Sequence, residues 1–177
     1  MGLLSKFDRF NPIDFKMFQT GALVDSLGVL GFGLTKVPML FYIGPVLKEI
    51  NDTTCCFRIP YKRRNLNHFN SMYFGVLAAG ADLAGGYLAM HQIKDLNSSV
   101  TLLFKDFKAD FLKRPEADTY FTCNDGEAVR AAVLEAEESG ERVNLPVEVI
   151  ATCPDQFQDE PVAKFVLTLS LKKKVKK

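Results

Sequence analysis

The sequence has few residues of the kinds that build metal sites, and it has no large excess of one charge. Its two histidines, His68 and His91, have no carboxylate at ligand spacing on one helix, which argues against a metal site. Lysine and arginine number 22 against 21 aspartates and glutamates, so the net charge of +1 gives no long-range attraction for nucleic acid. The lysine-rich end at 172–177 is interpreted as a solvated chain terminus. We therefore expect no metal, no cofactor and no nucleic-acid partner.

Signals for disulfides and for membrane spans are also scarce. The four cysteines show no C-x-x-C spacing: Cys55, Cys56, Cys123 and Cys153. Because no secretory leader precedes them, we expect reduced thiols and a cytoplasmic protein. The apolar segment 18–50 is interrupted by Asp25, Lys36 and Pro38, which leaves uncharged runs of about ten residues, short of the ~20 that a spanning helix needs. We expect no transmembrane segment, and a lipid-touching role for this segment is an open alternative.

Length and composition are those of one ordinary globular domain. The chain has 177 residues, of which 47% are hydrophobic and 24% charged, so neither a disordered nor a fibrous class is indicated. We predict a single domain over residues 1–177. Residues 1–45 would form an N-terminal helix and an apolar connection, and residues 46–177 the core.

Hydrophobic periodicity predicts both helices and strands. Helix-like spacing over 13–30 predicts a leading helix. From Val46 the period falls to two, which predicts a hairpin with a turn at Asn51 and Asp52. Alternation returns at 100–111, 119–123, 143–149 and 163–171, and an amphipathic helix over 125–139 interrupts it. We predict an α+β domain in which an antiparallel sheet wraps around a buried helix.

The segment 70–90 is apolar and contains a single charge, Asp82. It is too long for a strand, so we predict a buried helix over about 72–93, capped by the end of the polar loop 62–71. Positions three, four and seven residues from Asp82 are all glycine or alanine: Gly75, Ala78, Ala79, Gly85 and Gly86. Glycine costs about 1 kcal/mol per position in a helix interior. We therefore predict that another backbone packs on this face or that a ligand enters the space beside it.

The order of elements and the run 65–83 resemble the hotdog-fold thioesterase superfamily. The likeness is to its PaaI-like branch and to a related bacterial family of unassigned function, and it extends over roughly residues 38–173. In that branch a loop ending in two glycines leads into the central helix, and an acidic residue follows the second glycine by seven positions. Gly75 and Asp82 stand at this interval, and Asn65 and Asn67 match the asparagines that precede it.

One departure concerns the glycine pair. Where these thioesterases commonly carry His-Gly-Gly, this chain has Tyr73-Phe74-Gly75, so an aromatic residue replaces the first glycine and the histidine is missing. The motif is therefore more specific for the fold than for the reaction.

The resemblance implies a hotdog fold, an antiparallel sheet around a long central helix, with an extra N-terminal helix. It implies an acyl-CoA or acyl-carrier thioester as substrate, and a homodimer or homotetramer with sites between subunits. The amide of Gly75 would stabilise the negative charge that develops on the thioester oxygen. Asp82, whose pKa should be raised by burial, would activate water. Candidate substrate contacts are Asn70, Ser71, Tyr73, Phe74, Ala78 and Ala79.

Other interpretations of Asp82 stay open. It could be a satisfied buried carboxylate, bonded to backbone amides or to Arg63 or Arg64 across a subunit contact. The protein could also be a non-catalytic hotdog dimer that binds a fatty acyl or other hydrophobic ligand, which Phe74 and the missing histidine favour. A purely structural role is a third alternative.

Overall fold

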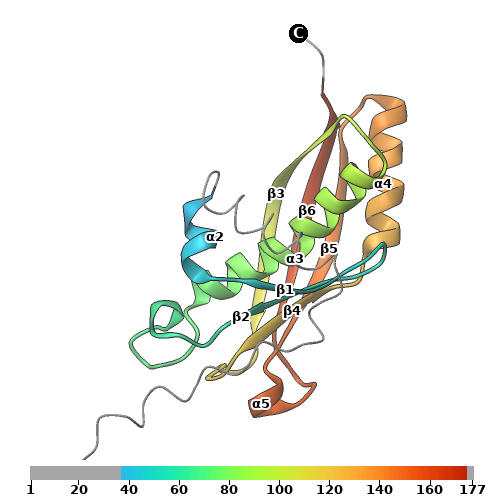
Figure 1. Ribbon diagram of the computed structural model, residues 1–177. Coiled ribbons are helices and arrows are strands. Elements are labelled where there is room, and N and C mark those ends of the chain that lie inside the picture. The colour runs from blue at the N-terminus through green and yellow to red at the C-terminus, as the bar shows by residue number, and fades with distance from the viewer. Residues whose placement is uncertain (1–36, 175–177) are drawn as a thin grey trace, which may run out of the picture.

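The computed structural model describes residues 37–174 (Figure 1). The leading helix predicted over 13–30 lies outside the described residues. The first described element is α2 (Pro38–Ile43), in a segment where we expected an irregular connection. Proline at the first helical position and Gly44 with φ of 65° at the end delimit this short helix. Its buried residues, Leu40 and Ile43, join the core.

Six strands form one antiparallel sheet in the order β1-β2-β4-β5-β6-β3. The strands are β1 (Val46–Ile50), β2 (Cys55–Ile59), β3 (Val100–Phe111), β4 (Thr119–Cys123), β5 (Val143–Thr152) and β6 (Pro161–Lys173). The predicted hairpin and the four later strands are confirmed. Burial alternates as the period of two requires, since Cys55, Phe57 and Ile59 of β2 are buried and the residues between them are not.

The long helix α3 (Phe74–Asp95) lies against the concave face of the sheet, which curves around it (Figure 1). The helix α4 (Gly126–Ser139) packs on α3 and on β5 and β6. Arg130 of α4 donates hydrogen bonds to Gln92 and Asp95 near the end of α3. The short helices η2 (Arg63–Asn65) and α5 (Pro154–Phe157) lie in connections. The predicted buried helix and amphipathic helix are both confirmed.

Two glycines let α3 approach the sheet closely. A Cβ atom at Gly80 would lie 2.5 Å from ring atoms of Phe121 on β4, and one at Gly85 would lie 3.3 Å from the Cγ2 atom of Val147 on β5. The sequence predicts that another backbone or a ligand lies against the small residues near Asp82. At Gly85 it is the sheet, which wraps far enough around the helix to cover this residue.

A β-bulge explains a change of phase within β3. Apolar residues occupy even positions up to Phe104 and odd positions from Phe107 onward. The pairing of β3 with β6 shifts between Phe104 and Asp106, opposite Leu169 and Thr168, so Lys105 is the extra residue. The bulge allows Phe104 to reach α3 and Phe107 to stack near Phe165, with ring centroids 5.6 Å apart.

We predict that Gly80→Ala destabilises the protein. The added methyl would overlap the fully buried ring of Phe121, and overpacking of this kind costs about 1–3 kcal/mol, more than the ~1 kcal/mol that alanine gains over glycine in a helix. Urea unfolding followed by circular dichroism should show a net decrease in the free energy of unfolding of up to about 2 kcal/mol.

The matched control is Gly75→Ala. A Cβ atom there would meet only the ring of Tyr73, which is exposed and free to rotate away, so stability should be kept. Equal stability of Gly80→Ala and the wild type would show that close contact with β4 does not require glycine.

Candidate functional site

Asp82 lies in the middle of α3 and is half-buried. Among the interactions of residues 37–174, its carboxylate has no hydrogen bond and no ion pair. The guanidinium of Arg64 instead lies over the ring of Tyr42, 5.8 Å from its centroid, and Arg63 forms no ion pair within the described part of the chain. Burial raises the pKa of Asp82 above its ordinary value, with no opposing hydrogen bond or cation. The described residues therefore do not form the alternative in which Arg63 or Arg64 neutralises Asp82.

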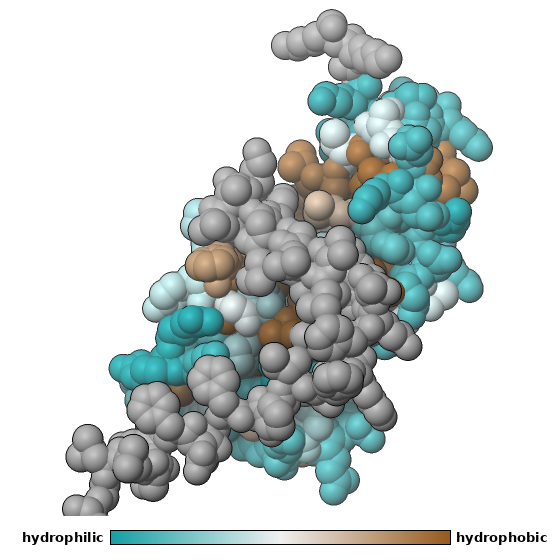
Figure 2. All heavy atoms as spheres, in the orientation of Figure 1, coloured by the Kyte–Doolittle hydropathy of each residue, from teal (hydrophilic) through white to brown (hydrophobic). Residues whose placement is uncertain are grey.

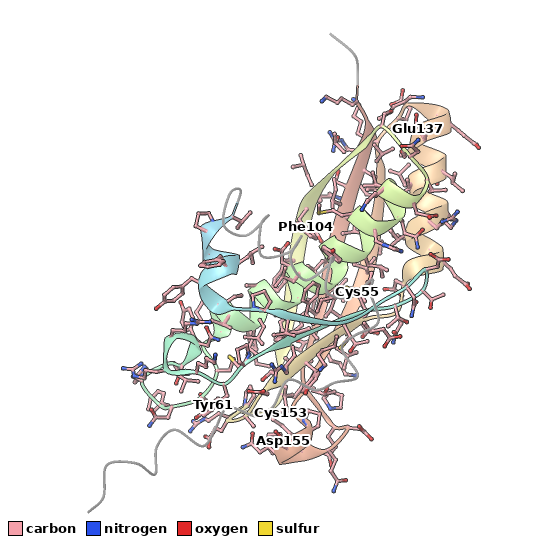
Figure 3. All side chains as sticks on the ribbon, in the orientation of Figure 1. Cys55, Tyr61, Phe104, Glu137, Cys153 and Asp155 are labelled. Atoms are coloured by element: carbon pink, nitrogen blue, oxygen red, sulfur yellow. The ribbon has the colours of Figure 1, made fainter. Side chains whose placement is uncertain are left out.

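Phe104, labelled in Figure 3, extends from β3 toward α3 and lies near Asp82. Gly86 follows Asp82 by one turn of α3. A Cβ atom at position 86 would be 3.1 Å from Cζ of Phe104 and 3.8 Å from Oδ1 of Asp82. The ring of Phe104 thus fills the space over Gly86, near the carboxylate.

Gly75 is the second residue of α3, where backbone amides have no intrahelical acceptor. The amides of Val76 and Leu77 both donate to the carbonyl of Tyr73, whereas those of Phe74 and Gly75 have no acceptor among the described residues. These two N–H groups point along the helix dipole and can donate to an anionic oxygen. The ring of Tyr73 lies against Gly75, its Cε1 atom 2.6 Å from where a Cβ would stand.

Gly75 and Asp82 are seven residues apart, which corresponds to about 10 Å along a helix axis. A single atom cannot lie within hydrogen-bond distance of both groups in one protomer. A carbonyl oxygen bound at Gly75 and a water molecule bound at Asp82 can fill this span together. The arrangement suits attack of water on a carbonyl carbon that lies between the two groups.

The loop before α3 is held by Asn65, which is fully buried. Its side-chain Nδ2 donates to the backbone carbonyls of Ile43 and Pro60, both at 2.9 Å. Its backbone carbonyl accepts a hydrogen bond from the backbone N–H of Tyr73 at 2.9 Å. Asn65 therefore fixes the start of α3, and with it the direction of the free amides. The asparagine that matched the family pattern has a positioning role in the described structure.

The structure separates the other predicted contacts into two groups. Ala78 is half-buried and lies one turn before Asp82 on α3, whereas Ala79 is buried. Tyr73 and Phe74 are exposed at the start of α3. Asn70 and Ser71 lie in the preceding loop and do not cap the helix, whose N-cap residue Tyr73 makes no side-chain cap. The predicted cap is thus wrong, because the Ser71 side chain and amide bond to Asn67 within the loop.

Two features of this region were missed at the level of sequence. One is Phe104, which bounds the space beside Asp82. The other is a hollow further along α3, lined in part by Met90 and Leu102. The phase change of β3 between Phe104 and Phe107 was the available signal, because it marks a bulge that re-aims side chains toward the helix.

The described residues offer no cluster of three histidine, cysteine or acidic side chains able to hold a metal ion. Within 37–174, no helix combines the length and the apolar character needed to cross a bilayer. All four cysteines are free thiols.

A curved antiparallel sheet wrapped around one long helix is the hotdog fold, and solved structures confirm it. A protein of unknown function from Chlorobaculum tepidum TLS is 14% identical, with a TM-score of 0.75 over 86% of this chain and 97% of its own. One from Pseudomonas aeruginosa, a probable thioesterase, is 23% identical, with a TM-score of 0.71 over 85% and 96%. A thioesterase from Haemophilus influenzae is 14% identical, with a TM-score of 0.59 over 81% and 88%.

The particular family follows from the sequence model that matches residues 30–170, a domain of unknown function, DUF4442. The chain belongs to this family. Among curated proteins, none matches the chain.

We predict that Asp82→Asn stabilises the folded protein at neutral pH. Because the pKa of Asp82 is raised on folding, the folded state holds this proton more tightly, and the stability contribution falls as pH rises through the raised pKa. Asparagine has no carboxyl group to ionise, so the variant avoids this loss of stability. Urea unfolding should show a gain for Asp82→Asn near pH 7 that shrinks as the pH is lowered from the raised pKa to the ordinary aspartate pKa.

The matched control is Asp110→Asn on the exposed part of β3, for which no such gain is expected. A loss of stability in Asp82→Asn at neutral pH would mean that the carboxylate has a stabilising partner.

Proposed function

We propose that the protein is an acyl thioesterase that hydrolyses a hydrophobic acyl thioester of coenzyme A or of an acyl-carrier protein. The observation that carries this proposal is the carboxylate of Asp82, which is partly desolvated and has no hydrogen bond or ion pair among the described residues. The free amides at the start of α3 and the thioesterases among the structural neighbours support it. The likeness in fold alone would not specify a reaction.

In the proposed reaction, Asp82 accepts a proton from water while the water oxygen bonds to the thioester carbonyl carbon. The carbonyl oxygen becomes negatively charged and accepts a hydrogen bond from the amide of Gly75. The tetrahedral intermediate then collapses, the carbon–sulfur bond breaks, and the proton passes from Asp82 to the departing thiolate. The products are a carboxylic acid and a thiol, and the Asp82 carboxylate is regenerated.

The raised pKa of Asp82 fits a general base better than an ordinary aspartate would. A base is most effective when its pKa approaches the working pH while it is still largely ionised. Desolvation moves the pKa of Asp82 in that direction. Activity should therefore increase with pH through the raised pKa and reach a plateau above it.

We further propose that the protein is a homodimer, or a tetramer of such dimers, located in the cytoplasm. No strand of the described residues pairs with the outer edge of β3, and four large apolar side chains along this strand are exposed: Leu103, Phe104, Phe107 and Phe111. A long apolar edge strand of this kind pairs readily with another strand. A second copy of β3 would cover it, and the free thiols are consistent with a reducing compartment.

A binding role without catalysis is the second candidate function. The ring of Tyr73 against Gly75 favours it, because that ring lies next to the amide assigned to the thioester oxygen. Native mass spectrometry of the purified protein would support this role if an intact acyl ligand copurifies and no hydrolysis is detected.

We predict that Asp82→Asn and Asp82→Ala lower kcat/KM by roughly 10²- to 10⁴-fold, the usual contribution of a positioned general base. The measurement is thiol release from a panel of acyl-CoA thioesters of different chain length, with Asp110→Asn as control. If the wild type cleaves no member of the panel, or if both Asp82 variants keep full activity, the proposed reaction is wrong.

We predict that Leu103→Lys on β3 shifts the protein from dimer to monomer, since it places a charge on the proposed subunit contact. Leu103 is 65% exposed, so the change should not harm the fold of the protomer. The measurement is molar mass by light scattering, and Leu134→Lys on the exposed side of α4 is the matched control. A wild type that is monomeric at micromolar concentration would exclude the proposed contact.

A further inference from the structure

A hollow of about 490 Å³ lies between the C-terminal half of α3 and the start of β3. This volume falls within the ~300–1,000 Å³ typical of small-molecule sites. Half of its eight lining residues are apolar, Met90 and Ile93 from the helix and Val100 and Leu102 from the strand, and they supply most of its surface. The other four are Lys94, Asn97, Ser98 and Thr101. Figure 2 shows hydrophobic surface in this region, next to the hydrophilic surface of α4. The mechanism described above does not use this hollow.

The hollow follows the candidate site along the same two elements, α3 and β3. On α3, Gly86 follows Asp82 by one turn and Met90 follows Gly86 by another. On β3, which runs past the helix in the opposite direction, Phe104 lies over Gly86 and Leu102 lines the hollow. The ring of Phe104 therefore stands between the Asp82 carboxylate and the apolar hollow.

We infer that this hollow binds the distal part of the substrate's acyl chain, which makes the substrate class a medium- to long-chain fatty acyl thioester. The inference rests on the proposed function, which places the thioester carbonyl near Asp82. From Asp82 to Ile93 is eleven residues, or about 16 Å of helix. Only a chain of many methylenes spans that distance, so a short or branched acyl group would leave the hollow empty.

Chain length should then control affinity by simple burial. Each methylene that leaves water for an apolar site improves binding about fourfold. The gain begins only when the chain is long enough to pass Phe104, so kcat/KM should rise with length beyond that point. Phe104 is partly exposed, which leaves its ring room to turn aside for the chain.

The first test fills the hollow by Met90→Trp. Met90 is exposed, so the larger side chain can be accommodated without disturbing the core. We expect at least a tenfold loss of kcat/KM for hexadecanoyl-CoA and little change for butanoyl-CoA. Leu134→Trp, the same kind of change on the exposed side of α4, should leave both values unaltered. An equal loss for both chain lengths, or no loss for either, would overturn the inference.

The second test does not depend on catalysis. The sequence has no tryptophan, so Thr101→Trp at the lining of the hollow introduces the only indole. We expect its fluorescence to change saturably with the thioether analogue of hexadecanoyl-CoA, which cannot be hydrolysed, and not with the butanoyl analogue. Leu134→Trp should not respond to either analogue.

The two tests separate failure of the inference from failure of the proposed function. If the wild type hydrolyses acyl-CoA but Thr101→Trp shows no fluorescence response, the proposed thioesterase reaction stands and this hollow is excluded as the acyl site. A response without hydrolysis by the wild type would keep the acyl site and exclude the proposed reaction, which would leave the binding role.

Discussion

The close fit of α3 into the curved sheet is the constraint on which the rest of the structure depends. The helix comes near enough to β4 and β5 that a side chain at Gly80 would overlap Phe121 and one at Gly85 would be in tight contact with Val147. Each glycine weakens the isolated helix by about 1 kcal/mol, so the helix is stable only because burial against the sheet offsets that loss. A helix with apolar residues all round is expected when a sheet covers most of its circumference.

This fit also determines what remains on the open side of the helix. Where the sheet wraps around α3, side chains of the strands fill the space beside the glycines. Near β3, the edge strand, Gly86 is buried as well, and its nearest described neighbours are the ring of Phe104 and the carboxylate of Asp82. The bulge at Lys105 sets how far Phe104 reaches toward α3.

The sequence was sufficient for most of the fold because its two periods are clean. Strict alternation in β2 and β4 and one unbroken apolar segment in α3 identify the elements without tertiary information. The sequence was not sufficient to predict what lies against each glycine of α3. A helical wheel shows which residues share a face but not how far a sheet curves around it, so it could not tell whether the sheet or a ligand lies against Gly85. The helix cap failed for a similar reason, since Asn67 competes for Ser71 locally.

The position of Asp82 links stability to chemistry. A carboxylate removed from water without a hydrogen-bond donor or a cation is unfavourable for folding, and that same environment raises its pKa. A purely structural site would be expected to supply a partner, as Asp118 has in Arg58, 2.9 Å away. The chain has arginines near the start of α3, yet Arg64 lies over Tyr42 rather than beside Asp82. The proposed reaction would use such an acid, because water would have to be activated where the acyl chain excludes bulk solvent.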